Sequence, residues 1–516
     1  MRTKKSIYNV IATISLYIIQ TLMAFVLRRV FLTAFGLDYA GLESVFANIL
    51  SLLSLAELGI GPAITYRLYK PLAEGDQREV ALLMGAYKQF YRIVALVVSC
   101  VGLFLSVCLP YIVPDAPVHG EQLYICFFLY LLQTSASYLL AYKRSLLLAD
   151  QEQYVTVMVD IVFNILQFVA RLLVLLFTQN YILYLIVGIV RAVTGNIVVS
   201  LICDRNYPFL KKKEYNKKSD IKSKMKEMSL DIWYIIYHKI GHYVYYSTDG
   251  IVISAFLGVA KAGLLGNYNL IVGVVNNLFI QCSSAIQASV GNFVTLAKED
   301  KESVQRLLTK MNYLYYSILS VCAICLFCLL SPFVRLWLGE DYLISQSVVL
   351  VICINLFIYC FYQPIANLYI VTGLLKEDKI TSSVAAIVNL AVSVMTVKQF
   401  GLIGVYIGTI LGSLVYVVGR TRIVFREYFC RSSKPYFYQL IKYFVITCGE
   451  CAVTALFVGT VECNGIGAFI VCALFSVVVP TGINIAIFYK TTEFRYTRDI
   501  LVKIIRKVRR QYDATD

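Results

Sequence analysis

Charged and amide side chains recur at helical spacing inside long apolar stretches of this sequence. Between residues 153 and 178, Asp160, Asn164, Gln167 and Arg171 are spaced i, i+4, i+7 and i+11. At about 100° per residue, these four side chains fall on one face of a helix. A charged group in the middle of a bilayer costs about 2.5–3.5 kcal/mol on insertion scales. The pattern therefore predicts either ion pairs inside a helix bundle or a polar path across a membrane.

A second set of polar residues lies in the stretches 7–35 and 229–257. Arg28 and Asp249 are both in the outer parts of these stretches. If the two stretches occupy equivalent places in two halves of the protein, Arg28 and Asp249 flank the seam between the halves. We expect both to line an aqueous cavity, with internal ion pairing as the alternative.

Two histidines, His238 and His242, share the helix face of Asp249. Imidazoles four residues apart can chelate a metal ion, but Lys239 lies beside them and would repel a cation. We therefore expect no metal site here and interpret the histidines as hydrogen-bonding or proton-linked groups in a wet cavity. Glu57, near mid-depth of the stretch 42–70, is a further polar candidate.

Apolar stretches long enough to cross a membrane must position these residues. The chain has 516 residues, of which 59% are hydrophobic and 15% charged, and its mean hydropathy is +0.71. At about 20 apolar residues per crossing, the sequence predicts an all-α integral membrane protein with about fourteen transmembrane helices. The approximate spans are 7–35, 42–70, 80–110, 122–148, 153–178, 182–204, 229–257, 263–296, 306–338, 343–373, 381–398, 402–425, 436–460 and 464–490.

The formal net charge of +16 reflects the predicted orientation of the chain in the membrane. Basic residues gather in alternate loops, including Arg2–Lys5, Arg205–Lys226 and Arg420–Lys434, whereas the opposite loops are nearly free of them. This positive-inside pattern places both termini in the cytoplasm. The basic surface faces anionic lipid headgroups, so we expect no nucleic-acid partner.

Part of the sequence repeats itself about 222 residues further on. Residues 34–42 (AFGLDYAGL) return at 255–264 (AFLGVAKAGL) with one residue inserted. Duplicated helical bundles are typical of transporters that bind substrate between two halves. We therefore predict two pseudo-symmetric six-helix bundles followed by two additional transmembrane helices. The predicted parts are bundles at 1–206 and 229–430, a basic cytoplasmic linker at 207–228, the additional helices at 431–490 and a basic tail at 491–516.

Motifs of enzyme chemistry are missing from the sequence. It contains no Gly-Lys-Ser/Thr phosphate loop, no His-Glu-x-x-His and no Gly-x-Ser-x-Gly. No outer loop is long enough to hold a catalytic domain. We expect a transporter that is not an enzyme and has no cofactor.

Two groups of motifs carry a resemblance to a known family. The stretch Leu55–Ala63 (LAELGIGPA), together with residues 31–42, looks like bacterial polysaccharide flippases. These form the Wzx-type branch of the multidrug, oligosaccharidyl-lipid and polysaccharide exporter superfamily. Thr248–Ser254 (TDGIVIS) is similar as well. The resemblance covers most of the chain and implies a MATE-like fold.

The resemblance implies that a lipid-linked oligosaccharide on polyprenyl pyrophosphate is moved to the outer leaflet of the bacterial cell membrane. A pyrophosphate enters low-dielectric surroundings only where cations meet it. The candidates to bind this substrate are Arg28, Arg29, Arg67 and Arg191, with the amides Asn276 and Gln281 facing the sugars. Glu57, His238, His242 and Asp249 could couple transport to protons or sodium. Besides this substrate, membrane lipids and polysaccharide-assembly proteins are the expected partners.

Three alternatives to this function stay open. A drug exporter of the same superfamily should have an acidic or aromatic cavity, whereas Arg28, Arg29 and Arg67 make this one basic. A flippase for peptidoglycan precursors or teichoic-type lipids would need the same charges. A membrane polymerase or ligase would want a large outer loop with Arg or His.

Overall fold

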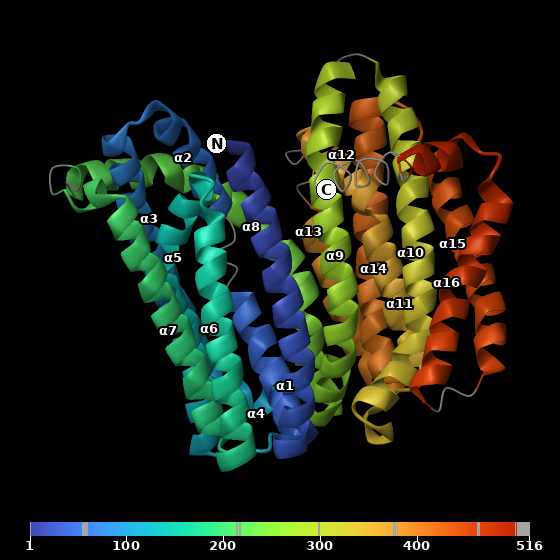
Figure 1. Cartoon of the computed structure of the whole chain (residues 1–516), viewed down its shortest axis with the longest axis horizontal. Helices are drawn as coiled ribbons and strands as arrows, with labels where there is room; N and C mark the ends of the chain where they lie inside the picture. Colours follow the sequence, from blue (N-terminus) through green and yellow to red (C-terminus); the bar gives the residue numbers. More distant parts are fainter. Residues whose placement is uncertain are drawn as a thin grey trace, which may run out of the picture. The chain divides into compact units, whose positions relative to one another are not determined.

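The computed structural model describes residues 2–53, 60–212, 215, 218–297, 300–374, 378, 380–461, 465–500 and 502. Over these residues the chain is helical and contains no strand (Figure 1). Twelve of the described helices are long and apolar enough to cross a membrane. The predicted all-α membrane fold is confirmed.

The predicted count of about fourteen spans is not decided by these helices. The first predicted span, 7–35, and residues 42–53 of the second lie within α1 (Arg2–Leu53). The second span then passes through residues outside the described ones and ends in α2 (Ile60–Glu74). Within the predicted span 229–257, the described apolar segment is Ser247–Leu257, which is shorter than a full membrane crossing. Fourteen spans stay a prediction that is consistent with the structure.

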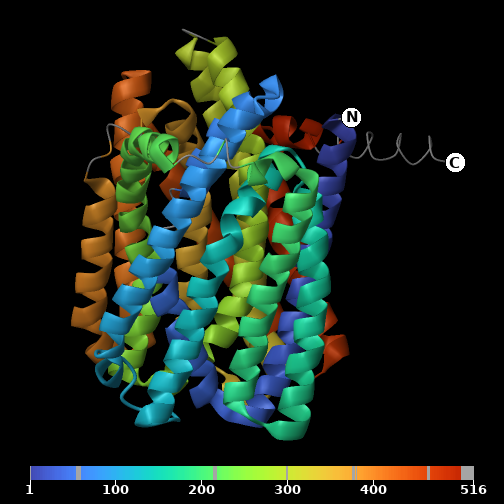
Figure 2. The ribbon, with the colours of Figure 1, turned by 90° about the vertical axis from the view of Figure 1, so that its left-hand side faces the viewer.

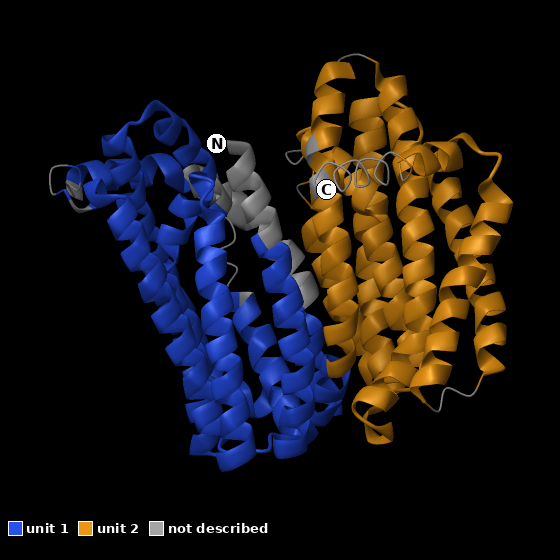
Figure 3. Ribbon diagram, in the orientation of Figure 1, with its two compact units in different colours: residues 1–266 blue, residues 267–516 orange. Residues whose placement is uncertain are grey.

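The helices form two compact units, residues 1–266 and 267–516 (Figure 3). Unit 1 includes α8 and the start of α9, which the repeat assigns to the second bundle. The compact units and the two copies of the repeat divide the chain at different places. The predicted bundle bounds, 1–206 and 229–430, stay a prediction. The helices that begin in unit 1 are α1, α2 (Ile60–Glu74), α3 (Gln77–Ser106), α4 (Leu109–Ile112), α5 (Glu121–Ala149), α6 (Gln153–Leu173), α7 (Tyr181–Asn206), α8 (Lys218–Leu257) and α9 (Val259–Ala297).

Unit 2 contains the rest of α9 and the helices after it. They are α10 (Lys301–Trp337), α11 (Gln346–Phe361), α12 (Gln363–Val371), α13 (Thr381–Phe400), α14 (Leu402–Ile423), α15 (Lys434–Gly459) and α16 (Ile466–Phe488). Short 3-10 or π segments are η2 (Val174–Thr178), η3 (Pro208–Lys211), η5 (Glu340–Tyr342) and η7 (Val424–Phe429). In the basic tail, residues 492–500 are helical.

Glycines at equivalent positions of the repeat make its two turns. Gly36 interrupts α1 with a φ of 82°, and Gly258 joins α8 to α9 with a φ of 89°. Both angles lie in the left-handed region, which glycine enters without steric cost. The repeated sequence therefore builds the same turn twice.

A second glycine pair of the repeat brings two backbones into contact inside unit 1. A Cβ atom added to Gly263 would lie 2.4 Å from the carbonyl oxygen of Leu37 and 2.7 Å from the backbone nitrogen of Gly41. A Cβ atom on Gly41 would lie 1.9 Å from the carbonyl oxygen of Val259. Only residues without a side chain permit this crossing of α1 and α9.

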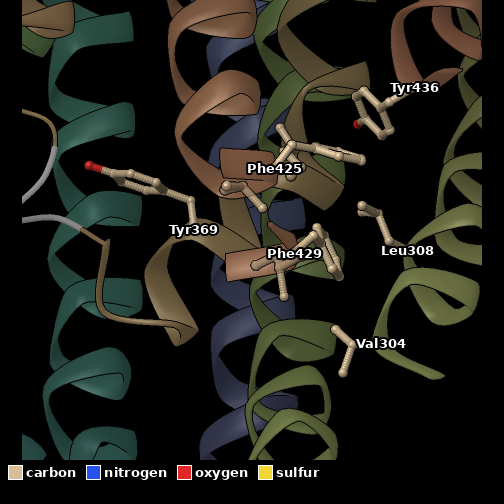
Figure 4. Close-up of a cluster of buried hydrophobic side chains, with 9 residues drawn as sticks. Val304, Leu308, Tyr369, Phe425, Phe429 and Tyr436 are labelled. Carbon is tan, nitrogen blue, oxygen red and sulfur yellow. The ribbon is translucent and has the colours of Figure 1, made fainter. Parts of the chain in front are cut away.

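Unit 2 has an aromatic core at one end of its bundle (Figure 4). The π-helical segment η7 contributes Phe425 and Phe429, whose rings lie 5.1 Å apart. Phe425 also contacts Tyr436 of α15, with ring centroids 5.4 Å apart. Val304 and Leu308 of α10 and Tyr369 of α12 join the same cluster. This core ties α10, α12 and α15 to the end of α14.

Replacing Gly263 by alanine should destabilise the protein, because the new methyl group meets only backbone atoms that cannot move aside. We expect a loss of about 1–3 kcal/mol, the usual cost of overpacking. Gly273→Ala is the matched control on the same helix, since nothing lies within 4 Å of its added Cβ atom. Thermal unfolding in detergent measures both, and equal melting temperatures would contradict the described contact.

Candidate functional site

An ion cluster joins α5, α6 and α7, which pack on one another in unit 1 (Figure 2). Both Asp160 oxygens accept hydrogen bonds from Arg144, at 2.8 and 3.0 Å. Arg191 donates to the same carboxylate at 3.1 Å and to the side-chain oxygen of Asn164 at 2.9 Å. Arg144 also donates to Asn196 at 3.0 Å. The cluster thus holds two guanidinium groups around one carboxylate.

A third arginine on the same face of α6 has a different environment. Arg171 lies about 16 Å beyond Asp160 along the helix, at about 1.5 Å per residue. Its guanidinium stacks over the ring of Tyr184 at 4.2 Å, and its Nε atom is buried with no hydrogen-bond partner. Among the described residues, no carboxylate pairs with it. Arg171 is therefore a cation at membrane depth whose hydrogen-bonding capacity is partly unused.

Ionic contacts continue the cluster at both of its ends. At one end, Lys143 donates to Asp204 and to Ser200, each at 2.6 Å. At the other end, Arg28 lies 3.8 Å from Glu43 and donates to the carbonyl oxygen of Gly263 at 3.0 Å.

Tyr184 connects Arg171 with the pair of Arg28 and Glu43, because it lies within the electrostatic reach of all three. We call the five basic residues the cation ladder: Lys143, Arg144, Arg191, Arg171 and Arg28.

The cation ladder carries a surplus of positive charge. Among the described residues, the ion pairs of these five cations involve three carboxylates, those of Glu43, Asp160 and Asp204. These groups are only partly buried, since the side chains of Arg144 and Arg191 keep 27% and 25% of their surface exposed. An anion of two charges would neutralise this surplus.

The structure places two of the predicted binding residues, Arg28 and Arg191, in the cation ladder. Both pair with carboxylates, which is the alternative that the sequence left open. Arg29 is exposed on α1. Whether any of the three binds a substrate stays a prediction.

Arg67 lies in a separate, polar hollow of about 270 Å³ at the end of α2. It donates to Glu227 at 2.8 Å, and Lys224 bonds the same carboxylate at 3.0 Å. These hydrogen bonds from Lys224 and Arg67 hold the pKa of Glu227 below its ordinary value. Glu74, Asp76 and Glu79 also line the hollow. Four carboxylates outnumber three cations there, so the hollow is a poorer anion site than the cation ladder.

The other predicted site residues are spread over both units. Asp249 is partly buried on α8, while Glu57 and the side chains of His238 and His242 lie outside the described ones. In unit 2, Asn276 accepts a hydrogen bond from the Cys360 thiol, with Sγ and Oδ1 3.6 Å apart.

Gln281, also in unit 2, is exposed on α9. An apolar groove of about 460 Å³ between α11, α14 and α15 offers no charged lining residue.

Sequence reasoning named Arg171 but left it as a possible ion-pair partner. The helical spacing correctly put it on the face of Asp160, and that spacing was the available signal. The role of Tyr184 could not be seen, because it depends on how α7 packs against α6. Many tyrosines serve as core: Tyr87, Tyr268, Tyr313, Tyr316 and Tyr369 are fully buried.

Comparison with solved structures defines the class of the fold. The structure titled lipid II flippase MurJ, inward closed conformation, aligns with a TM-score of 0.67 and 16% identity, over 94% of this chain and 99% of that chain. An inward-facing multidrug resistance MATE family transporter of the MOP superfamily gives a TM-score of 0.57 at 12% identity, covering 80% and 98%. A mutant of the Vibrio cholerae MATE transporter VcmN gives 0.51 at 12%, covering 83% and 98%. The fold is MurJ- and MATE-like.

The chain belongs to the family of polysaccharide biosynthesis proteins, which its residues 4–291 match. This match covers more than half of the 516 residues. A comparison with curated proteins found no match. The family match agrees with the predicted resemblance to polysaccharide proteins, and the chain is a multi-pass membrane protein.

Asp160→Asn should destabilise unit 1, because two guanidinium groups would then face each other without a charge between them. Breaking a buried pair costs about 3–5 kcal/mol, and the remaining exposure places the expected loss at the lower end of that range. Asp341→Asn, at an exposed position in η5, is the control. In a double-mutant cycle of unfolding free energies, Arg191→Gln should cost less in Asp160→Asn than in the parent. Additive losses would show that the two residues act independently.

Proposed function

We propose that the protein moves polyprenyl-pyrophosphate-linked oligosaccharide units from the inner to the outer leaflet for surface polysaccharide synthesis. Membership of the polysaccharide biosynthesis family supports this reading. The observation that carries it is the surplus of positive charge in the cation ladder, and above all Arg171, which stacks on Tyr184 and has no carboxylate among its described contacts.

Pyrophosphate chemistry fits the cation ladder. The headgroup must exchange water for charge-assisted hydrogen bonds as it crosses the low-dielectric region. Arginine suits this exchange, because its planar donors bond phosphate oxygens in pairs. The cations come from α1, α5, α6 and α7, so the headgroup can bind at several successive positions of moderate affinity and is not held at one tight site. The prenyl chain stays among the lipids while the two bundles alternate in access.

The remaining parts of the proposal follow from this substrate. Asn276 and Gln281 contact sugar hydroxyl groups, and Arg29 assists the arginines of the cation ladder. The protein resides in the bacterial inner membrane with both termini in the cytoplasm, where polysaccharide-assembly proteins supply and receive its substrate. Export of organic cations fits less well, because such cargo would be repelled by the surplus positive charge.

Transport of a peptidoglycan precursor is the second candidate. The lipid II flippase MurJ shares this fold over 94% of this chain and 99% of that chain. Both candidates present a lipid-linked pyrophosphate to the same charges, so the glycan distinguishes them.

Deletion of the gene tests the assignment. We expect loss of surface polysaccharide and accumulation of lipid-linked repeat units on the inner side. Accumulated peptidoglycan precursor with arrested wall growth would identify the second candidate. Unchanged glycans together with new sensitivity to cationic dyes would overturn both in favour of drug export.

Arg171→Gln should lower flipping of the lipid-linked oligosaccharide about 10- to 100-fold. A hydrogen bond to a charged group contributes about 1.5–3 kcal/mol, and about 1.4 kcal/mol is a factor of ten. The flipping rate of Arg171→Lys should lie between those of the parent protein and Arg171→Gln, since lysine keeps the charge but loses the paired donors.

The control for this series is Arg306→Gln, at an arginine on α10 that is 63% exposed. Complementation of the deletion strain, with protein levels matched, measures the effect. Full activity of Arg171→Gln would remove the central support of the proposal.

A further inference from the structure

A carboxylic acid is buried in unit 2 without a cation. Glu450, in the second half of α15, has only 1% of its surface exposed. Carboxylates at membrane depth are expensive unless a cation or several donors compensate them. Among the described residues, no basic side chain forms an ion pair with Glu450, and its Oε2 atom has no hydrogen-bond partner.

Among the described residues, the hydrogen-bond donors to this carboxyl are neutral. The hydroxyl of Tyr316 on α10 donates to Oε1 at 3.2 Å, and the amide of Asn484 on α16 donates to the same atom at 3.3 Å. Asn484 is itself held in place, because it accepts from Tyr313 at 3.2 Å and donates to Ser320 at 3.4 Å. Glu450 is thus the centre of a neutral polar network between α10, α15 and α16.

Aromatic rings close the network off from water. Tyr443 stacks on Tyr316 with ring centroids 4.3 Å apart, and Phe488 lies 5.7 Å from Tyr316. Among the described residues, the titratable groups within electrostatic reach of Glu450 are the phenols of Tyr313 and Tyr316 on α10. Tyr443, on the helix of Glu450, stacks on Tyr316. The contacting residues of α16, Asn484 and Phe488, are not titratable.

Two charged groups lie at the edge of this aromatic cluster. Lys442 lies over the ring of Phe488 at 5.7 Å. Glu493 is within electrostatic reach of Tyr313 and Tyr443. Neither charge forms an ion pair with Glu450.

We propose that Glu450 is a proton-binding site, neutral when α15 and α16 are seated on α10. The added proton lies on Oε2, while Oε1 accepts from Tyr316 and Asn484. A metal cation is a poorer occupant, because the amide hydrogens of Asn484 point at Oε1 and its carbonyl oxygen already accepts from Tyr313. Release of the proton leaves a charge in an apolar contact and weakens the seating of the helix pair. Binding of a proton to Glu450 does not depend on the proposed function. A link between this proton and the flipping of lipid-linked oligosaccharide rests on that function.

Infrared spectroscopy of the purified full-length protein in lipid nanodiscs tests proton binding without any transport assay. We expect a protonated-carboxyl carbonyl band at neutral pH that is absent from Glu450→Gln. The matched control is Glu302→Gln, at a glutamate on α10 that is 62% exposed, and it should keep the band. A band that is unchanged in Glu450→Gln would overturn the proposal. Loss of the band when choline is replaced by sodium at fixed pH would also overturn it, in favour of a metal cation site.

A second variant leaves Glu450 in place. Tyr316→Phe removes one donor to the carboxylate and keeps the ring, so the charged form loses stabilisation and proton affinity should rise about 2- to 10-fold, the equivalent of one hydrogen bond. The carbonyl band should then persist to higher pH than in the parent protein. An unchanged titration would show that Tyr316 does not face a titrating acid and would count against the proposal. Failure of these titrations concerns Glu450 alone, whereas failure of the deletion experiment concerns the proposed function.

Discussion

The contact between Asp160 and the guanidinium groups of Arg144 and Arg191 is the interaction on which unit 1 depends. It fixes α5, α6 and α7 at a common depth, because each helix contributes a charge that the apolar surroundings would otherwise reject. Once these three helices are fixed, the face of α6 is fixed as well. Arg171 is then held against Tyr184 of α7, where no described carboxylate satisfies it. The ion pairs of Asp160 with Arg144 and Arg191 thus fix the position of Arg171.

Charge compensation is incomplete in opposite senses in the two units. In unit 1, the cations of the cation ladder outnumber the carboxylates that pair with them among the described residues. Unit 2 satisfies its own buried arginine fully, since Arg420 bonds Asp378 at 2.8 Å, Tyr362 at 3.1 Å and Ser382 at 3.2 Å. Its uncompensated group is instead the acid Glu450. An isolated charge in low dielectric either finds a counter-charge or changes its protonation, so the two groups point to different ligands.

The glycines of the repeat show how duplication serves this arrangement. Gly36 and Gly258 turn the chain, and Gly41 and Gly263 let the two copies touch through their backbones. This contact places the start of α9 beside Arg28, which donates to the carbonyl oxygen of Gly263. The Arg28 end of the cation ladder is therefore tied to the second copy of the repeat by a hydrogen bond to its main chain.

The sequence by itself determined the all-α membrane fold, the duplicated turns and the face of α6 that carries Asp160 and Arg171. These features depend on helical periodicity, hydrophobic length and glycine placement, which are local properties of the chain. Only the tertiary structure decided which charges meet. Arg67 falls among carboxylates brought in by α3 and α8, and Arg171 meets a tyrosine of α7. Glu450 is buried by the next helix, α16, and by α10, whose Tyr316 lies 134 residues away in the sequence. Pairing between helices is set by packing across long sequence separations, and no spacing within one segment encodes it.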